Sequence, residues 1–169
     1  IIEKGYFYIR FGDVSRSVIY DLNIIDNNIK SGGVDLGDSR SEPKDTLLEA
    51  VLIGNQISDS SYYGLKVSGS NSDQSNTLLV EIRDNIISRS RLSNIRIGIS
   101  DNVGGLGKII QAIVEGNSIV DQGIVVYGGG GNNTIITDIL KNQFTWSTNV
   151  DVVNSAIFLL GGSGLVTEG

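Results

Sequence analysis

Four short segments of this sequence each carry a charged residue shortly before a closing glycine. They are Arg10 in "YIRFG", Asp35 in "VDLG", Lys66 in "LKVSG" and Arg96 in "IRIG". If these segments stack, Lys66 and Arg96 lie about 5 Å apart, and two neighbouring cations favour an anionic ligand such as a uronate sugar. The alternative is a solvated row of alternating charge formed by Arg10, Asp35 and Lys66, in which each pair contributes about 0–1 kcal/mol.

Aromatic residues offer a second kind of binding chemistry. Tyr62 and Tyr63 occupy one loop, Trp146 occupies another, and the run "YFYIRF" spans residues 6–11. Aromatic rings combine a large apolar face with a polar edge, which suits stacking against a sugar or contact with a protein. Tyr62, Tyr63 and Trp146 are therefore candidate ligand-binding residues. The alternative is that these rings cover the turns and hold the longer loops in place.

The composition restricts the chemistry and the partners. The 169 residues include no His and no Cys, so the usual general base near neutral pH, imidazole and thiolate metal ligands, and disulfides are all excluded. The formal charge of −6 argues against a nucleic-acid partner, because phosphates are neutralised by clustered Lys and Arg. No apolar run approaches the roughly 18 residues of a membrane-spanning helix. No cofactor is expected.

Two sets of residues recur with one period. Paired aliphatic residues begin at positions 18, 47, 78, 109 and 135, with spacings of 29, 31, 31 and 26 residues. An asparagine two residues before an Ile or Phe recurs with spacings of 28, 30, 32 and 25 residues, as Asn27, Asn55, Asn85, Asn117 and Asn142. A period of about 30 residues indicates a solenoid.

The repeating unit is built from short strands. Its segments are β-branched, are separated by Gly, Asn, Asp and Ser, and show no helical apolar stripe. In stacked coils, equivalent residues lie about 4.8 Å apart, and an amide side chain offers both a donor and an acceptor to its neighbours. Asparagine also tolerates the left-handed backbone conformation of a sharp corner. The recurring asparagines are therefore predicted to form a hydrogen-bonded ladder at a turn.

An asparagine ladder at a turn with stacked aliphatic residues inside resembles the pectate-lyase-like superfamily of right-handed parallel β-helices. The resemblance covers residues 6–161 and rests on this pattern, because no catalytic motif of that superfamily is matched. It implies an all-β, right-handed parallel β-helix, which the repeat count sets at five to six coils. It also implies a sugar-binding groove on one outer sheet. The superfamily's lyases use Arg or Lys as a base, whereas its polygalacturonase branch needs a His and is excluded.

Acidic residues suggest two further features. Counting from each aliphatic pair predicts one column in which acids alternate with alanines, so that no two carboxylates are neighbours: Asp21, Ala50, Glu81, Ala112 and Asp138. Calcium needs several converging oxygens, which such a column does not supply. The acidic loops at 37–45 and 69–76 are the places where Ca²⁺ would bind. No metal-ligand set is predicted.

The chain is expected to form a single β-helix domain over residues 1–169. Exposed strand edges at the two ends of a solenoid need a cover, and no amphipathic capping helix is recognisable in the sequence. Two explanations stay open: the chain is a fragment of a longer solenoid, or its ends stack head to tail into a filament.

The favoured function is an extracellular or cell-surface structural and interaction module. Such a module would be part of an adhesin, spike or fibre and would recognise glycan through the outer sheet. Its partners would be polysaccharide, or other copies of the chain bound through the solenoid ends. The alternative is a polysaccharide lyase or glycoside hydrolase acting on an anionic polysaccharide. In that case Lys66, Arg96 and Asp35, with Arg91 nearby, are the candidate catalytic residues. The absence of His weighs against an enzyme.

Overall fold

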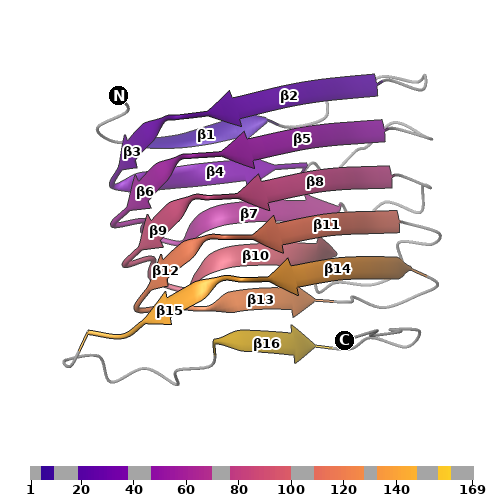
Figure 1. Ribbon diagram of the computed structural model, residues 1–169. Helices are drawn as coiled ribbons and strands as arrows, with labels where there is room; N and C mark the ends of the chain where they lie inside the picture. Colours follow the sequence, from indigo (N-terminus) through magenta and orange to yellow (C-terminus); the bar gives the residue numbers. More distant parts are fainter. Residues whose placement is uncertain are drawn as a thin grey trace.

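The computed structural model describes residues 5–9, 19–37, 47–69, 77–99, 109–127, 133–147 and 156–160. These residues form a right-handed parallel β-helix in which three parallel sheets enclose one core (Figure 1). The five strands of each smaller sheet span four full turns, slightly fewer than the five to six coils predicted. The described residues contain no helix.

The sheets are named by their end strands. The β1–β16 sheet contains β1 (Gly5–Ile9), β4 (Gly32–Leu36), β7 (Tyr63–Gly69), β10 (Ser93–Ile99), β13 (Ile124–Tyr127) and β16 (Ile157–Leu160). The β2–β14 sheet contains β2 (Ile19–Ile25), β5 (Leu47–Ile53), β8 (Thr77–Arg83), β11 (Ile109–Glu115) and β14 (Thr134–Leu140). The β3–β15 sheet contains β3 (Asn28–Lys30), β6 (Gln56–Ser58), β9 (Ile86–Ser88), β12 (Ser118–Val120) and β15 (Gln143–Thr145). The first two sheets face each other, and the third closes one side (Figure 1).

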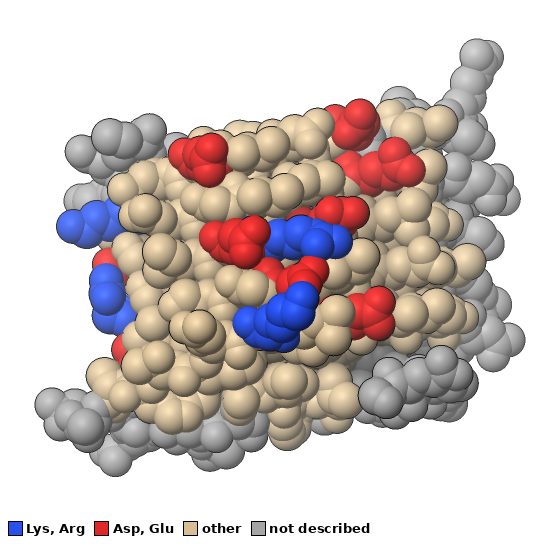
Figure 2. Space-filling model, viewed as in Figure 1, with Lys and Arg blue, Asp and Glu red and all other residues tan. Residues whose placement is uncertain are grey.

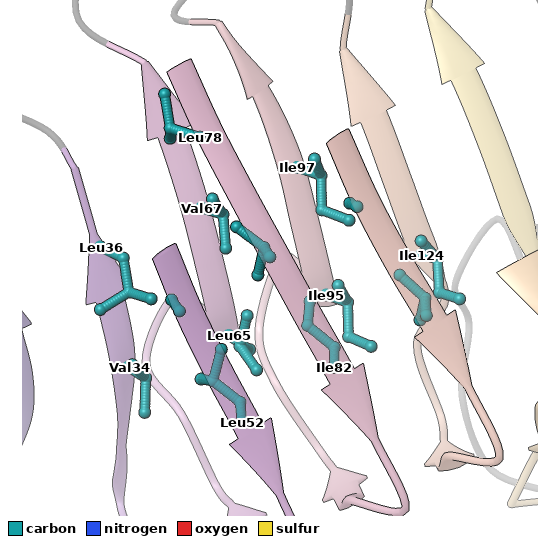
Figure 3. Packing of buried hydrophobic residues seen from close by; sticks show 14 of the residues in the cluster. Val34, Leu36, Leu52, Leu65, Val67, Leu78, Ile82, Ile95, Ile97 and Ile124 are labelled. Atoms are coloured by element: carbon teal, nitrogen blue, oxygen red, sulfur yellow. The ribbon is translucent and has the colours of Figure 1, made fainter. Parts of the chain in front are cut away.

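Each strand alternates between core and surface. In β8, Leu78, Val80 and Ile82 are at most 3% exposed, whereas the intervening Leu79 and Glu81 are partly exposed. Figure 3 shows residues of β4, β7, β10 and β13 packing against Leu52, Leu78 and Ile82 of the opposite sheet. Each fully buried Leu or Ile stabilises the fold by about 1.5–3 kcal/mol.

The asparagine ladder is confirmed. Each side chain donates from Nδ2 to Oδ1 of the asparagine in the next coil, over 3.1, 2.9, 3.0 and 2.8 Å from Asn27 to Asn142. The same Oδ1 also accepts the backbone N–H of the preceding asparagine. The three inner members, Asn55, Asn85 and Asn117, are fully buried. Their amides therefore satisfy polar groups that the turn would otherwise bury without partners.

The left-handed residue at this corner is the one before each asparagine, and not the asparagine as predicted. Asp26, Gly54, Asp84, Gly116 and Lys141 have φ between 53° and 69°. This conformation lets the chain turn sharply from the β2–β14 sheet into the β3–β15 sheet. The asparagine can then extend its side chain along the solenoid axis.

The predicted column of alternating acids and alanines is wrong. Strand pairing places Asp21 beside Glu49 and places Ala50 beside Val80. The physical reason is that one member of each aliphatic pair faces the core. That member is the second residue in Leu47-Leu48 and the first in Leu78-Leu79, so counting from the start of the pair shifts the register by one. Two carboxylates, Asp21 and Glu49, therefore do lie on neighbouring strands.

Candidate functional site

An outward-facing column on the β1–β16 sheet contains most of the charged candidates. It runs through Tyr8, Asp35, Lys66, Arg96, Val125 and Phe158. The register predicted from closing glycines placed Arg10 beside Asp35, and that register is wrong. Gly5 pairs with Gly32, so Tyr8 takes the position next to Asp35. Arg10 itself lies outside the described residues.

Asp35 and Lys66 form an ion pair across neighbouring strands. Lys66 Nζ lies 3.5 Å from Asp35 Oδ1, and the two side chains are only 14% and 16% exposed. This pair is much less solvated than a typical surface ion pair, so its attraction is screened less. Because the two charges offset each other, the column from Asp35 to Arg96 carries one net positive charge, not the two that Lys66 and Arg96 would give without Asp35.

Arg96 is held by two tyrosines. Its guanidinium carbon lies 5.1 Å from the centre of the Tyr63 ring and 5.8 Å from that of Tyr127. An Arg96 Nη1–H group also donates to the Tyr63 hydroxyl. Both rings are within the range of cation–π attraction, which fixes the guanidinium against the sheet.

Tyr6 links the first strand to a turn two coils away. Its hydroxyl lies 2.6 Å from Ser60 Oγ and accepts the backbone N–H of Tyr62 at 2.8 Å. Gly33 makes this reach possible, because a Cβ at that position would lie 3.1 Å from the Tyr6 ring and 2.5 Å from two backbone carbonyl oxygens. The missing side chain lets the ring cross the neighbouring strand.

These residues surround a small cleft of about 180 Å³, which we call the tyrosine cleft. It is lined by Tyr6, Tyr8, Val34, Asp35, Tyr62, Tyr63 and Lys66. Tyr8 and Tyr62 are 52% and 56% exposed, and their rings lie 5.4 and 6.4 Å from that of Tyr6. In its described lining, the cleft therefore combines accessible aromatic faces with the Asp35 carboxylate and the Lys66 ammonium group.

Two predicted site residues lie elsewhere. Arg91 is exposed in the turn between β9 and β10, where its backbone N–H donates to the carbonyl of Ser60, and its side chain does not line the cleft. Trp146 follows β15, and its ring packs 6.4 Å from that of Phe144. Trp146 does not line the tyrosine cleft, and its role in a ligand-binding surface with Tyr62 and Tyr63 stays a prediction.

The sequence reasoning missed three tyrosines and one asparagine. Tyr6 and Tyr8 belong to the aromatic run at 6–11, but the shifted register hid their relation to Asp35. Tyr127 follows an apolar segment and gave no signal of its contact with Arg96.

Asn94 is fully buried and donates from Nδ2 to the carbonyl of Val120 at 2.8 Å. It precedes an Ile directly and so departs from the spacing of the ladder.

Two further ion pairs link neighbouring coils at the corners of the solenoid. Arg89 donates to both carboxylate oxygens of Asp59, over 2.6 and 3.0 Å, from the neighbouring coil. The hydrogen bond from Arg89 lowers the pKa of Asp59 below its ordinary value. The hydrogen bond that Lys141 donates likewise lowers the pKa of Glu115 on the β2–β14 sheet. These pairs connect coils and do not border the tyrosine cleft.

The described residues contain no group of three or more acids arranged to hold a metal ion. Nearly all of the acidic loops at 37–45 and 69–76, where calcium was expected, lie outside the described residues.

No helix in the described part is long and apolar enough to cross a membrane. Comparison of the chain with protein-family models, curated proteins and solved structures finds no match.

Proposed function

We propose that this β-helix is an extracellular or cell-surface interaction module, and that the tyrosine cleft binds a saccharide. The observation that carries the proposal is the cleft itself, in which exposed rings of Tyr8 and Tyr62 flank the Asp35–Lys66 pair. The faces of sugar rings present C–H groups that pack on aromatic rings. Sugar hydroxyls hydrogen-bond well to charged groups.

The geometry favours an uncharged saccharide over a uronate. Lys66 is paired with Asp35, and Arg96 is held by Tyr63 and Tyr127, so neither cation faces the cleft alone. A carboxylate ligand would have to compete with Asp35 for Lys66. A neutral sugar ring can stack on tyrosine and use both charged groups for its hydroxyls.

Binding can be tested by affinity electrophoresis and calorimetry with neutral and uronate-containing polysaccharides. Tyr8→Ala should weaken binding at least fivefold, because it removes an exposed ring from the cleft. Phe158→Ala is the matched control, since Phe158 is an exposed aromatic in the same column at the far end of the sheet. Equal affinities for both variants, or no binding to any polysaccharide, would refute the saccharide proposal.

A catalytic role receives less support. Glycoside hydrolysis requires a pair of carboxyl groups about 5–9 Å apart, and among the described residues Asp35 is the only acid that lines the tyrosine cleft. In a lyase, Lys66 would have to approach the substrate as the base, but its Nζ is ion-paired with Asp35 at 3.5 Å. Incubation with each polysaccharide, followed by assays for reducing ends and for unsaturated products, tests this alternative directly.

Self-association is a second candidate function, favoured by the polarity of the ladder. Within the described residues, Nδ2 of each ladder asparagine donates to Oδ1 of the next one. One end of the ladder therefore presents the acceptor Oδ1 of Asn27, and the other end presents the backbone N–H of Asn142. A second copy stacked end to end would continue the ladder in the same direction. Heterologous contacts of this kind form filaments when they do not close.

Electron microscopy and sedimentation across protein concentrations test this candidate. Leu159 belongs to an inward-facing column but is 49% exposed, because no strand pairs with the far edge of β16 in the described part. Leu159→Lys should therefore prevent assembly. Phe158→Lys, which adds the same charge on the outward face, should not. A monomer at every concentration would contradict self-association.

A further inference from the structure

A second hollow lies on the outer face of the β2–β14 sheet, opposite the sheet that carries the tyrosine cleft. It has a volume of about 540 Å³ and extends from Asp21 in β2 to Asp138 in β14. We call it the axial groove, because it crosses all five strands along the solenoid axis. Figure 2 looks onto this face. Uncharged residues cover most of it, and acidic and basic residues are scattered among them.

The groove follows from strand alternation. Two columns of outward side chains form its walls, and the residues between them point inward. Ala50, Val80 and Ala112 belong to this inward column, so the floor of the groove is backbone. The two walls are two residues apart along each strand, which makes the groove about 6.6–7 Å wide. Its length across the five strands is about 19 Å. An α-helix is about 10–12 Å wide, so an extended chain fits this groove better than a helix does.

Four of the nine described outward side chains that line the walls are aliphatic, and they alternate with polar ones. Val51, Leu79, Ile113 and Ile136 line them, and Ile136 is 49% exposed. Outward aliphatic side chains in this number are unusual for a solvated sheet face, where polar residues normally alternate with the core. Aliphatic side chains that are gathered in a surface hollow indicate an interaction site.

Carboxylates are set among these apolar side chains. Asp21 and Glu49 lie on neighbouring strands, and Asp138 lies near the other end of the groove. Within the described part of the chain, none of these three is ion-paired with Lys or Arg. Glu81 also lines the groove, and Arg83 binds it at 3.1 Å. Like charges on neighbouring strands repel each other, and a bound cation would relieve that repulsion.

From this complementarity we infer that the axial groove binds an extended, lysine-rich segment of a partner protein. Lysine supplies an ammonium group for the carboxylates and a four-carbon stem for the aliphatic walls. A second copy of this chain fits poorly, because each copy carries a formal charge of −6. The inference is independent of saccharide binding, which uses the opposite sheet.

The test is fluorescence anisotropy with a labelled ten-residue peptide of alternating Lys and Val, titrated with the whole chain at low and high salt. Asp21→Asn/Glu49→Gln should weaken binding five- to tenfold. Asp26→Asn/Asp84→Asn is the matched control, because it removes two exposed acids outside the groove and changes the net charge equally. Leu79→Ser should also weaken binding, whereas Leu92→Ser, at an exposed turn position, should not.

Tighter binding of the Lys-Val peptide than of a Lys-Ser or Glu-Val peptide, with loss only in the groove variants, supports the inference. Equal weakening by the two double variants would show non-specific attraction to an acidic protein and would overturn it. Absence of binding at low salt would also overturn it. So would binding of a neutral polysaccharide that is lost in the groove variants.

Discussion

Asn85 and Asn117 are joined by a 3.0 Å hydrogen bond from Nδ2 to Oδ1, although 32 residues separate them in the chain. The same Asn117 oxygen accepts the backbone N–H of Asn85 at 2.9 Å. Each coil is thus tied to the next by paired bonds to one buried oxygen. The ladder fixes the register at the corner, where a slip by one residue would turn every core side chain outward.

Asn85→Ala should lower the free energy of unfolding by about 1–3 kcal/mol, because it leaves buried groups without partners. The affected groups include the carbonyl of Leu52 and Nδ2 of Asn55. Urea denaturation followed by circular dichroism measures the effect. Asn28→Ala is the control, since Asn28 is exposed and lies just outside the ladder. Equal stability of the Asn85 and Asn28 variants would contradict the structural role of the ladder.

Ile87→Ala should destabilise the solenoid by about 2–5 kcal/mol, because it opens a cavity at a fully buried position. The neighbouring Ile86 points outward and is 49% exposed, so Ile86→Ala should change stability by less than about 0.5 kcal/mol. Thermal and urea unfolding of the two variants give the comparison. Similar losses for both would mean that the register of β9 is wrong.

Gly116→Ala should cost about 1–2 kcal/mol, because Gly116 has φ of 69° and alanine is strained in that conformation. A Cβ there would also lie 2.5 Å from Asp84 Oδ1. That contact involves the end of a flexible side chain, so the backbone should account for most of the loss. Asp84 itself has φ of 53°, so Asp84→Gly should relieve strain of its own, and the double variant Gly116→Ala/Asp84→Gly is compared with Asp84→Gly alone. A Gly116→Ala loss that disappears in the Asp84→Gly background would show that the contact was responsible.

The fold was predictable because stacking repeats the same demands in every coil. Inward aliphatic residues and the asparagine at the corner recur at positions that simple spacing reveals, and both predictions hold. Register within a coil was not predictable to the residue, because Leu47-Leu48 and Leu78-Leu79 differ in which member faces the core. The tyrosine cleft was only partly predictable. Its partners come from three coils, and the pairing of Tyr8 with Asp35 depends on a register that no local pattern specifies.

Lys66→Ala was expected from the sequence to leave stability nearly unchanged, and the structure changes that expectation. Lys66 and Asp35 are each more than four-fifths buried, so removing Lys66 takes a charge-offsetting contact from a poorly solvated carboxylate. We expect a loss of about 1–3 kcal/mol. The variant Asp35→Asn/Lys66→Met should recover part of it, as a double-mutant cycle in urea would show. Strictly additive losses would mean that the two side chains do not interact.

The Asp59–Arg89 pair predicts a small dependence of stability on pH at the acid end. The hydrogen bond from Arg89 lowers the pKa of Asp59 from its ordinary value of 3.8, so the folded state favours the charged carboxylate. Its contribution is fully present above pH 3.8 and is lost as the pH falls through the lower folded-state value. The two side chains are 35% and 56% exposed, so the contribution should be at most about 1 kcal/mol.

Arg89→Gln therefore should be less stable than the unmodified chain at pH 7, and this difference should shrink progressively below pH 3.8. Melting temperatures of the two proteins, measured from pH 7 down to pH 2.5, give the difference at each pH. Using the difference removes the effect of other carboxylates that titrate in the same range. Arg91→Gln is the control, because Arg91 is an exposed arginine of the same turn without a described ion pair. A difference for Arg89→Gln that stays constant across this range would show that Asp59 does not favour its charged form through Arg89.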